Sequence, residues 1–176
     1  MTDTFLGRGH LDLDNTAIIK QCYDFLENHT LNDIDSIYGK LDGRLSTVVM
    51  AIYLTKNNLK HLMPHNWPVL VPLVEAIKKQ SNLETVERSW FNILPANTNL
   101  GEHSHVNSKN NGATYGSFVF YPEVVEGDSQ IELLLDSKWV PINVQTGDWI
   151  CFGLDCIHRV PKNKTDHHRI SIVFNI

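Results

Sequence analysis

Cysteine is scarce in this chain: only Cys22, Cys151 and Cys156 occur among its 176 residues. An odd and sparse set without repeated spacing argues against a disulfide framework and favours reduced thiols in a cytoplasmic protein. No histidine–cysteine zinc pattern surrounds Cys151 and Cys156. We therefore expect both thiols to pack in the core.

Long apolar runs and a surplus of positive charge are lacking as well. No run approaches the ~18 residues that a membrane-spanning helix needs. The first residues show no basic region followed by an apolar one, so we expect neither a membrane span nor a signal peptide. The 15 lysines and arginines are outnumbered by 20 acidic residues, which gives a net charge of −5. Without an assured basic face, sequence-independent binding to nucleic acid is not expected.

The remaining composition is that of an ordinary globular domain, with 42% hydrophobic and 20% charged residues. The chain shows no internal repeat and no obvious linker, and its length suits one compact core. We predict a single domain over residues 1–176, in which residues 1–84 form a helical supporting region and residues 85–176 form the core that carries the functional site.

Two amphipathic helices are predicted in the first half of the chain. One begins at the polar pair Asn15-Thr16, and the other runs from Val69 to Gln80, with prolines near its first turn and lysines near its end. Residues 45–55 are rich in β-branched side chains, and periodicity alone does not decide between a strand and a buried helix. The first helix would have an apolar stripe of Ile18, Ile19, Cys22, Phe25 and Leu26.

From about Thr85 onward, short apolar segments alternate with clusters of Gly, Pro, Asn and Asp, which is typical of antiparallel strands. Short strands that follow two helices predict an α+β fold, mainly β, in which a sandwich or barrel is buttressed by the helices. The candidate strand segments are 85–94, 113–122, 130–136, 138–144, 148–153, 158–161 and 169–176.

The last segment, RISIVFNI, has two unlike faces. Strand alternation places Ile170, Ile172, Phe174 and Ile176 on one face, which can pack against another layer. The opposite face carries Arg169, Ser171, Val173 and Asn175. That face is too polar for dry packing and unlike an exposed strand, so it would suit the wall of a polar cavity.

Three histidines form a candidate metal site. In an extended segment residues two apart point the same way, so His103 and His105 can reach one ion. His158 follows a strand that starts after the Gly147-Asp148 turn, and it can approach them from another strand. The alternative is a solvated polar loop for the first two, with His158 half-buried against a backbone carbonyl.

Arg169 follows His158 by eleven residues. If residues 161–168 form a hairpin turn, the two residues oppose each other on antiparallel strands and project to the same face. A guanidinium in such a cavity can bind a carboxylate through two parallel hydrogen bonds, and Ser171 can add a hydroxyl. The alternative for Arg169 is an ion pair with Asp148 or Asp155.

The segments SWFNILPANTNLGEHSHVNS, SFVFYP and GDWICF, followed by His158 and RISIVFN, resemble the 2-oxoglutarate- and iron(II)-dependent oxygenases. The nearest likeness is to a small microbial and phage-type group with an H-x-H motif, and it covers residues 86–176. It implies a double-stranded β-helix (jelly-roll, cupin-like) core and a dioxygenase that uses Fe(II), 2-oxoglutarate and O2. Such an enzyme hydroxylates a C–H bond and releases succinate and CO2. The primary substrate and the oligomeric state are not indicated.

The resemblance also implies roles for particular residues. His103 and His158 would bind the iron, while Arg169 and Ser171 would hold the C5 carboxylate of 2-oxoglutarate. The pocket would in addition be lined by Trp90, Asn92 and Tyr115.

His105 departs from the family pattern, because most members carry Asp or Glu at this position as the third ligand. We prefer a site of three histidines. Two histidines with an open position are a second possibility, and completion by Glu102 or Asp155 is a third.

Two other functions stay open. GDWICFGLDCIH resembles the second cupin motif, so a cupin-type metal enzyme that does not use 2-oxoglutarate is one, although the glutamate expected after H-x-H is absent. A non-catalytic binding module on the same fold is the other.

Overall fold

The computed structural model describes residues 4–28, 45–46, 64–86 and 88–176. Of the segment 45–55, only Leu45–Ser46 is described, as a short strand, and the rest lies outside the described residues. In chain order the elements are β1 (Phe5–His10), α1 (Asn15–Asn28), β2 (Leu45–Ser46), 3-10 turns at Pro64–Asn66 and Pro68–Leu70, α4 (Val71–Ser81), β3 (Arg88–Leu94), β4 (Leu100–His103), a 3-10 segment at Val106–Asn111, β5 (Ser117–Phe120), β6 (Ile131–Leu135), β7 (Lys138–Ile142), β8 (Asp148–Phe152), β9 (His158–Val160) and β10 (Arg169–Asn175).

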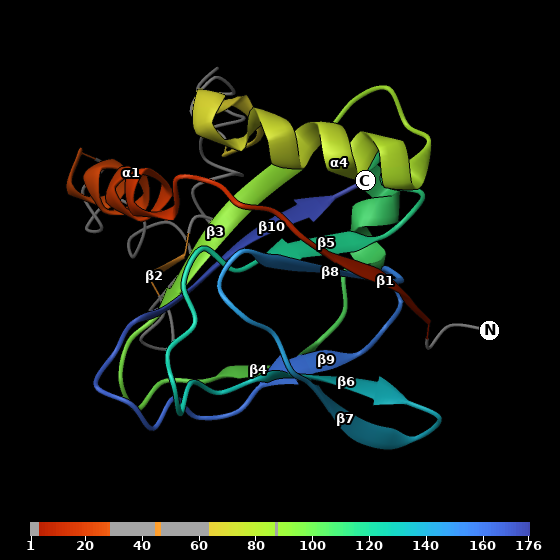
Figure 1. The fold of residues 1–176 in the computed structure, drawn as a ribbon. Helices are drawn as coiled ribbons and strands as arrows, with labels where there is room; N and C mark the ends of the chain where they lie inside the picture. The colour runs from red at the N-terminus through yellow and green to blue at the C-terminus, as the bar shows by residue number, and fades with distance from the viewer. Residues whose placement is uncertain (1–3, 29–44, 47–63, 87) are drawn as a thin grey trace.

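The strands form two facing sheets in which all pairs are antiparallel. The larger sheet has the order β1-β8-β5-β10-β3-β2, and the smaller has the order β4-β9-β6-β7. Helices α1 and α4 lie on one side of the larger sheet, and the smaller sheet lies on its other side (Figure 1). This is the predicted α+β, mainly β architecture of a double-stranded β-helix.

The two faces of strand β10 contact different parts of the molecule. Ile170, Ile172 and Phe174 belong to the hydrophobic core under the helices, together with Leu73 and Ile77 of α4. The intervening residues of β10 face the space between the sheets, where they line a cavity. The predicted division of this strand into an apolar face and a polar cavity wall is therefore confirmed.

Both predicted helices are present. In α1 the cap lies one residue before the predicted Asn15, because the backbone N–H of Ala17 donates to the Asp14 carboxylate. Ile18 and Cys22 of its predicted stripe are buried in the core. Helix α4 follows a 3-10 turn that holds Pro68, and it ends at Asn82, whose left-handed conformation closes the last turn.

All the predicted strand segments contain a strand, but two strands were not predicted, β1 and β4. Strand β1 pairs with β8, so the larger sheet draws on the region for which only helices were predicted. The sequence did not predict this strand because it contains two glycines, and glycine is rare in strands. At Gly9 a Cβ atom would lie 2.5 Å from the Trp149 ring, which explains why a side chain is missing there.

The predicted hairpin between His158 and Arg169 is wrong. Strand β9 pairs with β4 and β6 in the smaller sheet, whereas β10 pairs with β3 and β5 in the larger one. Residues 161–168 cross from one sheet to the other instead of turning back. The two residues thus face the same cavity from opposite walls, because the sheets face each other.

Asn163 anchors this crossing segment. Its side chain is fully buried. The amide Nδ2 donates to the carbonyl oxygens of Leu94 and His167, at 3.2 and 2.7 Å, and Oδ1 accepts from the backbone N–H and the hydroxyl of Thr165. The side chain therefore ties the crossing to the end of β3, next to Arg169.

We expect Asn163→Ala to lower the free energy of unfolding by about 3 kcal/mol, because it leaves several buried polar groups without partners. Urea denaturation would measure the loss. The exposed neighbour offers a control, since Lys164→Ala should change stability by less than about 0.5 kcal/mol. Equal effects of the two substitutions would contradict the anchoring role.

The three cysteines are free and buried, as predicted. Cys151 packs in the core under the helices, and Cys156 packs in the core between the sheets. Within the described ranges, no helix combines the length and apolarity needed to cross a membrane.

Candidate functional site

Three histidines converge between the sheets. His103 of β4 and His158 of β9 are direct cross-strand partners, and their ring centroids lie 4.1 Å apart. His105 lies beyond the end of β4, where its backbone N–H donates to the carbonyl of Leu154. One nitrogen from each ring lies within 4.8 Å of the others. Residues predicted from spacing alone are thus brought together by a strand pair and one loop hydrogen bond.

Hydrogen bonds orient the histidine rings. Nδ1 of His103 donates to the carbonyl of Gly101 at 2.8 Å, and Nδ1 of His158 donates to the carbonyl of Cys156 at 3.0 Å. A ring nitrogen that donates in this way leaves the other nitrogen, Nε2, with a free lone pair, which is the usual arrangement around a bound metal. Nδ1 of His105 lies 2.9 Å from the Ser117 hydroxyl.

His105 and His158 are held in the neutral form that binds metals. The pKa of His105 is lowered to about 3, mainly by burial and also by the charges of His103 and Arg88, while a hydrogen bond with the Asn175 side chain opposes this shift. Burial also lowers the pKa of His158 well below its ordinary value, with smaller contributions from His105 and His103. At neutral pH both rings therefore keep their lone pairs available.

The donor set fits a transition-metal ion. An ion about 2.1 Å from each nitrogen requires the three nitrogens to lie within about 4 Å of one another, so small side-chain rotations suffice to close the present spacing. Imidazole ligands suit iron, zinc, copper and nickel. The alternative of a solvated loop does not describe His103 and His105, since both are partly buried and their rings contact that of His158. His158 does bond a backbone carbonyl, that of Cys156, as its alternative predicted, but it is buried and belongs to the histidine cluster.

A cavity of about 450 Å³ extends from the three histidines to the larger sheet. Its far wall is formed by alternate residues of the paired strands β3 and β10, and the other residues of β3 face the helices. The cavity residues of these strands are Arg88, Trp90, Asn92, Leu94, Arg169, Ser171, Val173 and Asn175.

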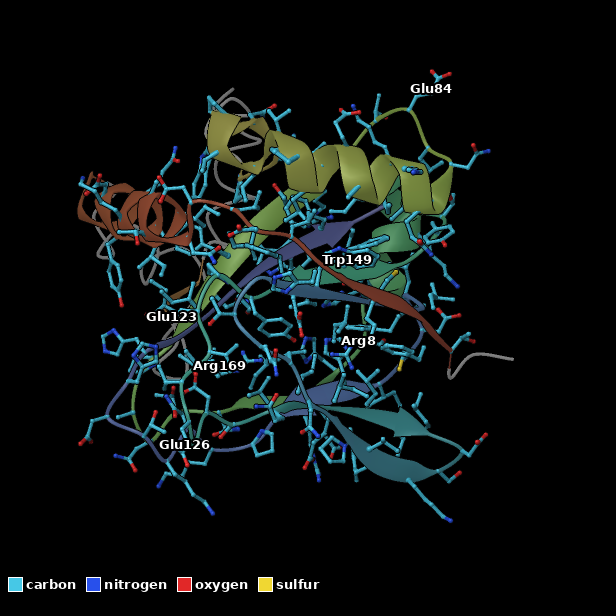
Figure 2. The ribbon with its side chains drawn as sticks, viewed as in Figure 1. Arg8, Glu84, Glu123, Glu126, Trp149 and Arg169 are labelled. Atoms are coloured by element: carbon cyan, nitrogen blue, oxygen red, sulfur yellow. The ribbon has the colours of Figure 1, made fainter. Side chains whose placement is uncertain are left out.

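Arg169 is a buried cation at one end of this wall, only 4% exposed, and it lies between the two sheets (Figure 2). Its Nε donates to the carbonyl of Ser129 at 2.9 Å, and the guanidinium carbon lies 5.2 Å from the centre of the Tyr121 ring. Burial raises the pKa of Tyr121 to about 12, against the opposing effect of the Arg169 charge. Tyr121 is therefore neutral at physiological pH and cannot act as the counter-ion of Arg169, although its ring contacts the guanidinium.

The predicted alternative for Arg169, an ion pair, is wrong. Asp148 pairs with Arg8 and His10, and Asp155 pairs with Lys109. Within the part of the chain that the structure describes, no carboxylate lies within salt-bridge distance of Arg169. A buried charge without a counter-ion is costly, so this guanidinium is suited to an anion that arrives with a ligand.

Tyr115 does not lie in the cavity, contrary to our prediction. Its ring stacks on Phe118 in the core under the helices, and its hydroxyl donates to the carbonyl of Gln80. The backbone N–H groups of Tyr115 and Gly116 both donate to the carbonyl of Ile176. This arrangement resembles a β-bulge, in which two residues oppose one, and it reverses the alternation that would have turned Tyr115 inward.

The two candidate carboxylate ligands lie outside the histidine group. Glu102 borders the cavity, but its carboxylate accepts a hydrogen bond from Arg159, and strand alternation turns it away from its neighbour His103. Asp155 pairs with Lys109. The cluster of potential ligands consists of His103, His105 and His158, so the geometry favours three histidines over a carboxylate-completed set.

Some residues that line the cavity or contact its histidines were not predicted as site residues. Arg88 shares the alternation of Trp90 and Asn92 on β3, and that period could have revealed it. Ser117 and Tyr121 could not have been found in this way, since their roles depend on contacts with His105 and Arg169 that only the fold creates.

No family model matches this sequence, and no curated protein matches it. Solved structures do resemble the fold. One is an oxidoreductase of the 2OG-Fe(II) oxygenase family from Burkholderia pseudomallei, with 15% identity and a TM-score of 0.51 over 64% of this chain. The match spans 57% of that protein, little more than half of its length.

Two further structures align over nearly the whole chain. A prolyl-4-hydroxylase from Pseudomonas putida has 15% identity and a TM-score of 0.60, covering 98% of this chain and 93% of its own. SnoK, a non-heme alpha-ketoglutarate-dependent carbocyclase from nogalamycin biosynthesis, has 12% identity and a TM-score of 0.64, covering 96% and 79%. At these identities the likeness shows a shared fold, as the sequence resemblance predicted, and leaves activity to be argued from the site.

Proposed function

We propose that this protein is an Fe(II)- and 2-oxoglutarate-dependent dioxygenase. The observation that carries the proposal is the pairing of two features in one cavity: three clustered histidines on one wall and the buried Arg169, without a carboxylate partner among the described residues, on the other. A ligand that chelates a metal at one end and carries a carboxylate at the other satisfies both. The structural likeness to a member of the 2OG-Fe(II) oxygenase family also supports the proposal.

In this proposal His103, His105 and His158 hold the iron. Arg169 and Ser171 bind the C5 carboxylate of 2-oxoglutarate, with Asn92 opposite Ser171 on the same wall. When bound, iron would supply the chemistry in which 2-oxoglutarate and O2 are converted to succinate and CO2, with one oxygen atom entering succinate and the other the substrate C–H bond. The protein itself orients both ligands and excludes water, and no side chain is needed as a general base.

The apolar lining supports the exclusion of water. Leu94, Val119, Ile131 and Val160 surround the polar groups, and all are buried. An arginine–carboxylate pair is strengthened in such surroundings, since little water competes for its hydrogen bonds. Three histidines alone would also suit a cupin-type metal enzyme that does not use 2-oxoglutarate, and Arg169 is what favours the oxygenase.

Anaerobic titration with Fe(II) and then 2-oxoglutarate tests the proposal. We expect a visible metal-to-ligand charge-transfer band that saturates at one 2-oxoglutarate per iron. Succinate formation on admission of O2 then separates an oxygenase from a binding module, which should not decarboxylate 2-oxoglutarate. If iron binds and no band develops, the cosubstrate assignment is wrong.

A further inference from the structure

The cavity is longer than the cosubstrate that the proposed function assigns to it. Four cross-strand pairs of β3 and β10 form its wall in sequence: Leu94–Arg169, Asn92–Ser171, Trp90–Val173 and Arg88–Asn175. Strands rise about 3.3 Å per residue, so the first and last pairs lie roughly 20 Å apart. With carbon–carbon bonds of about 1.5 Å, the five-carbon chain of 2-oxoglutarate spans roughly 6 Å. A molecule anchored at Arg169 therefore leaves the Arg88 end free.

Arg88 places a second cation at that end. The residue is half-buried and borders the cavity. Among the residues that the structure describes, it has no carboxylate partner, and Glu102, the acidic residue of the cavity rim, is engaged by Arg159. Arg88 lines the same cavity as the three histidines. Asn175, its cross-strand partner, adds an amide to the same position.

A pair of apolar residues separates Arg88 from the part of the cavity wall assigned to 2-oxoglutarate. Trp90 and Val173 form the intervening pair, and both are buried. The Trp90 ring meets the His105 ring edge-on, with 5.4 Å between their centroids. A molecule that lies on Trp90 is therefore next to the histidine cluster, while an anionic group on it can reach Arg88.

We propose that the primary substrate is a small anion whose carboxylate or phosphate binds Arg88 and Asn175 while its apolar body packs on Trp90 and Val173. The inference rests on the proposed function for the position of 2-oxoglutarate. The apolar body then carries the C–H bond presented to the metal. A cavity of about 450 Å³ is of the size that holds small-molecule ligands.

The test uses the 176-residue chain loaded with Zn(II), which cannot turn over, in the presence of saturating 2-oxoglutarate. Fluorine NMR would measure the binding of 4-fluorobenzoate, 4-fluorophenyl phosphate and the neutral 4-fluorobenzamide. We expect at least one anion to bind about tenfold more tightly than the amide, and Arg88→Gln to remove that preference. Arg88→Lys should retain part of it, and Lys164→Gln, which removes an exposed charge, should have no effect.

The outcomes separate the possibilities. A preference for the benzoate or for the phenyl phosphate supports the inference and identifies the anion. Equal binding of the amide, undiminished anion binding by Arg88→Gln, or no binding of either anion would overturn it. Loss of anion binding in Arg169→Gln rather than in Arg88→Gln would do the same, by placing the anion at the other end.

The proposed function is judged separately, from 2-oxoglutarate binding in the same samples. Anion binding that depends on Arg88 in a protein that does not bind 2-oxoglutarate would support the anion site and overturn the dioxygenase. Normal 2-oxoglutarate binding without Arg88-dependent anion binding would support the dioxygenase and overturn the anion site.

Discussion

His158→Ala is expected to weaken Fe(II) binding by at least ~100-fold, more than the 10- to 100-fold typical of changes in the residues around metal ligands. His158 is the most buried of the three histidines, and its Nδ1 hydrogen bond to Cys156 leaves Nε2 for the ion. Anaerobic competition with a chromophoric chelator would measure the affinity. His10→Ala is a matched control, because His10 lies on β1, paired with Asp148 outside the cluster.

The same assay tests the third ligand. His105→Ala should lose most of the affinity that His158→Ala loses if three histidines bind the ion. His105→Asp should keep iron bound, because it recreates the set of two histidines and one carboxylate common to non-haem iron sites. Full iron affinity in His105→Ala would contradict the three-histidine site, and full affinity in His158→Ala would contradict the metal centre altogether.

Arg169→Gln is expected to raise the dissociation constant of 2-oxoglutarate by about 100-fold, the equivalent of about 3 kcal/mol for a buried charge pair that loses one partner. Titration of the charge-transfer band would measure it. Iron affinity in the absence of 2-oxoglutarate should not change. Arg169→Lys should fall between the two, since lysine keeps the charge and loses the two-pronged hydrogen bonds.

Stability distinguishes this role from a structural one. Among the described residues, the contacts of Arg169 are with neutral groups, the Ser129 carbonyl and the Tyr121 side chain. Removing a buried charge that lacks a counter-ion should therefore leave the unfolding temperature unchanged or raise it. A large drop in that temperature together with normal 2-oxoglutarate affinity would show that Arg169 is a structural residue.

A third histidine in place of a carboxylate changes the charge of the site. Three neutral ligands leave the charge of Fe(II) to be balanced by 2-oxoglutarate alone, whereas a carboxylate ligand would make the same complex negative. Arg88, which lines the same cavity as His105, adds a further positive charge. Because of both features, the proposed site attracts an anionic substrate more strongly than a site with a carboxylate ligand would.

Local patterns in the sequence predicted much of this molecule. The alternation in β10 assigned each residue to a face, and the segments between turn residues located the other strands from β5 onward. These predictions succeeded because the face of a strand residue depends only on a period of two. The same period failed at Tyr115, where two consecutive N–H groups share the Ile176 carbonyl and shift the alternation by one.

Strand pairing was beyond the sequence, because it depends on contacts between distant residues. His158 and Arg169 were correctly assigned to one cavity for the wrong reason: they lie on facing sheets and not on a hairpin. The sequence by itself determined the residue types of the site, the faces of its strands and the helices that support it. The tertiary structure alone decided that the candidate partners of Arg169, Asp148 and Asp155, pair with other cations, and that Arg88 shares its cavity, because charge neutralisation depends on which side chains meet in space.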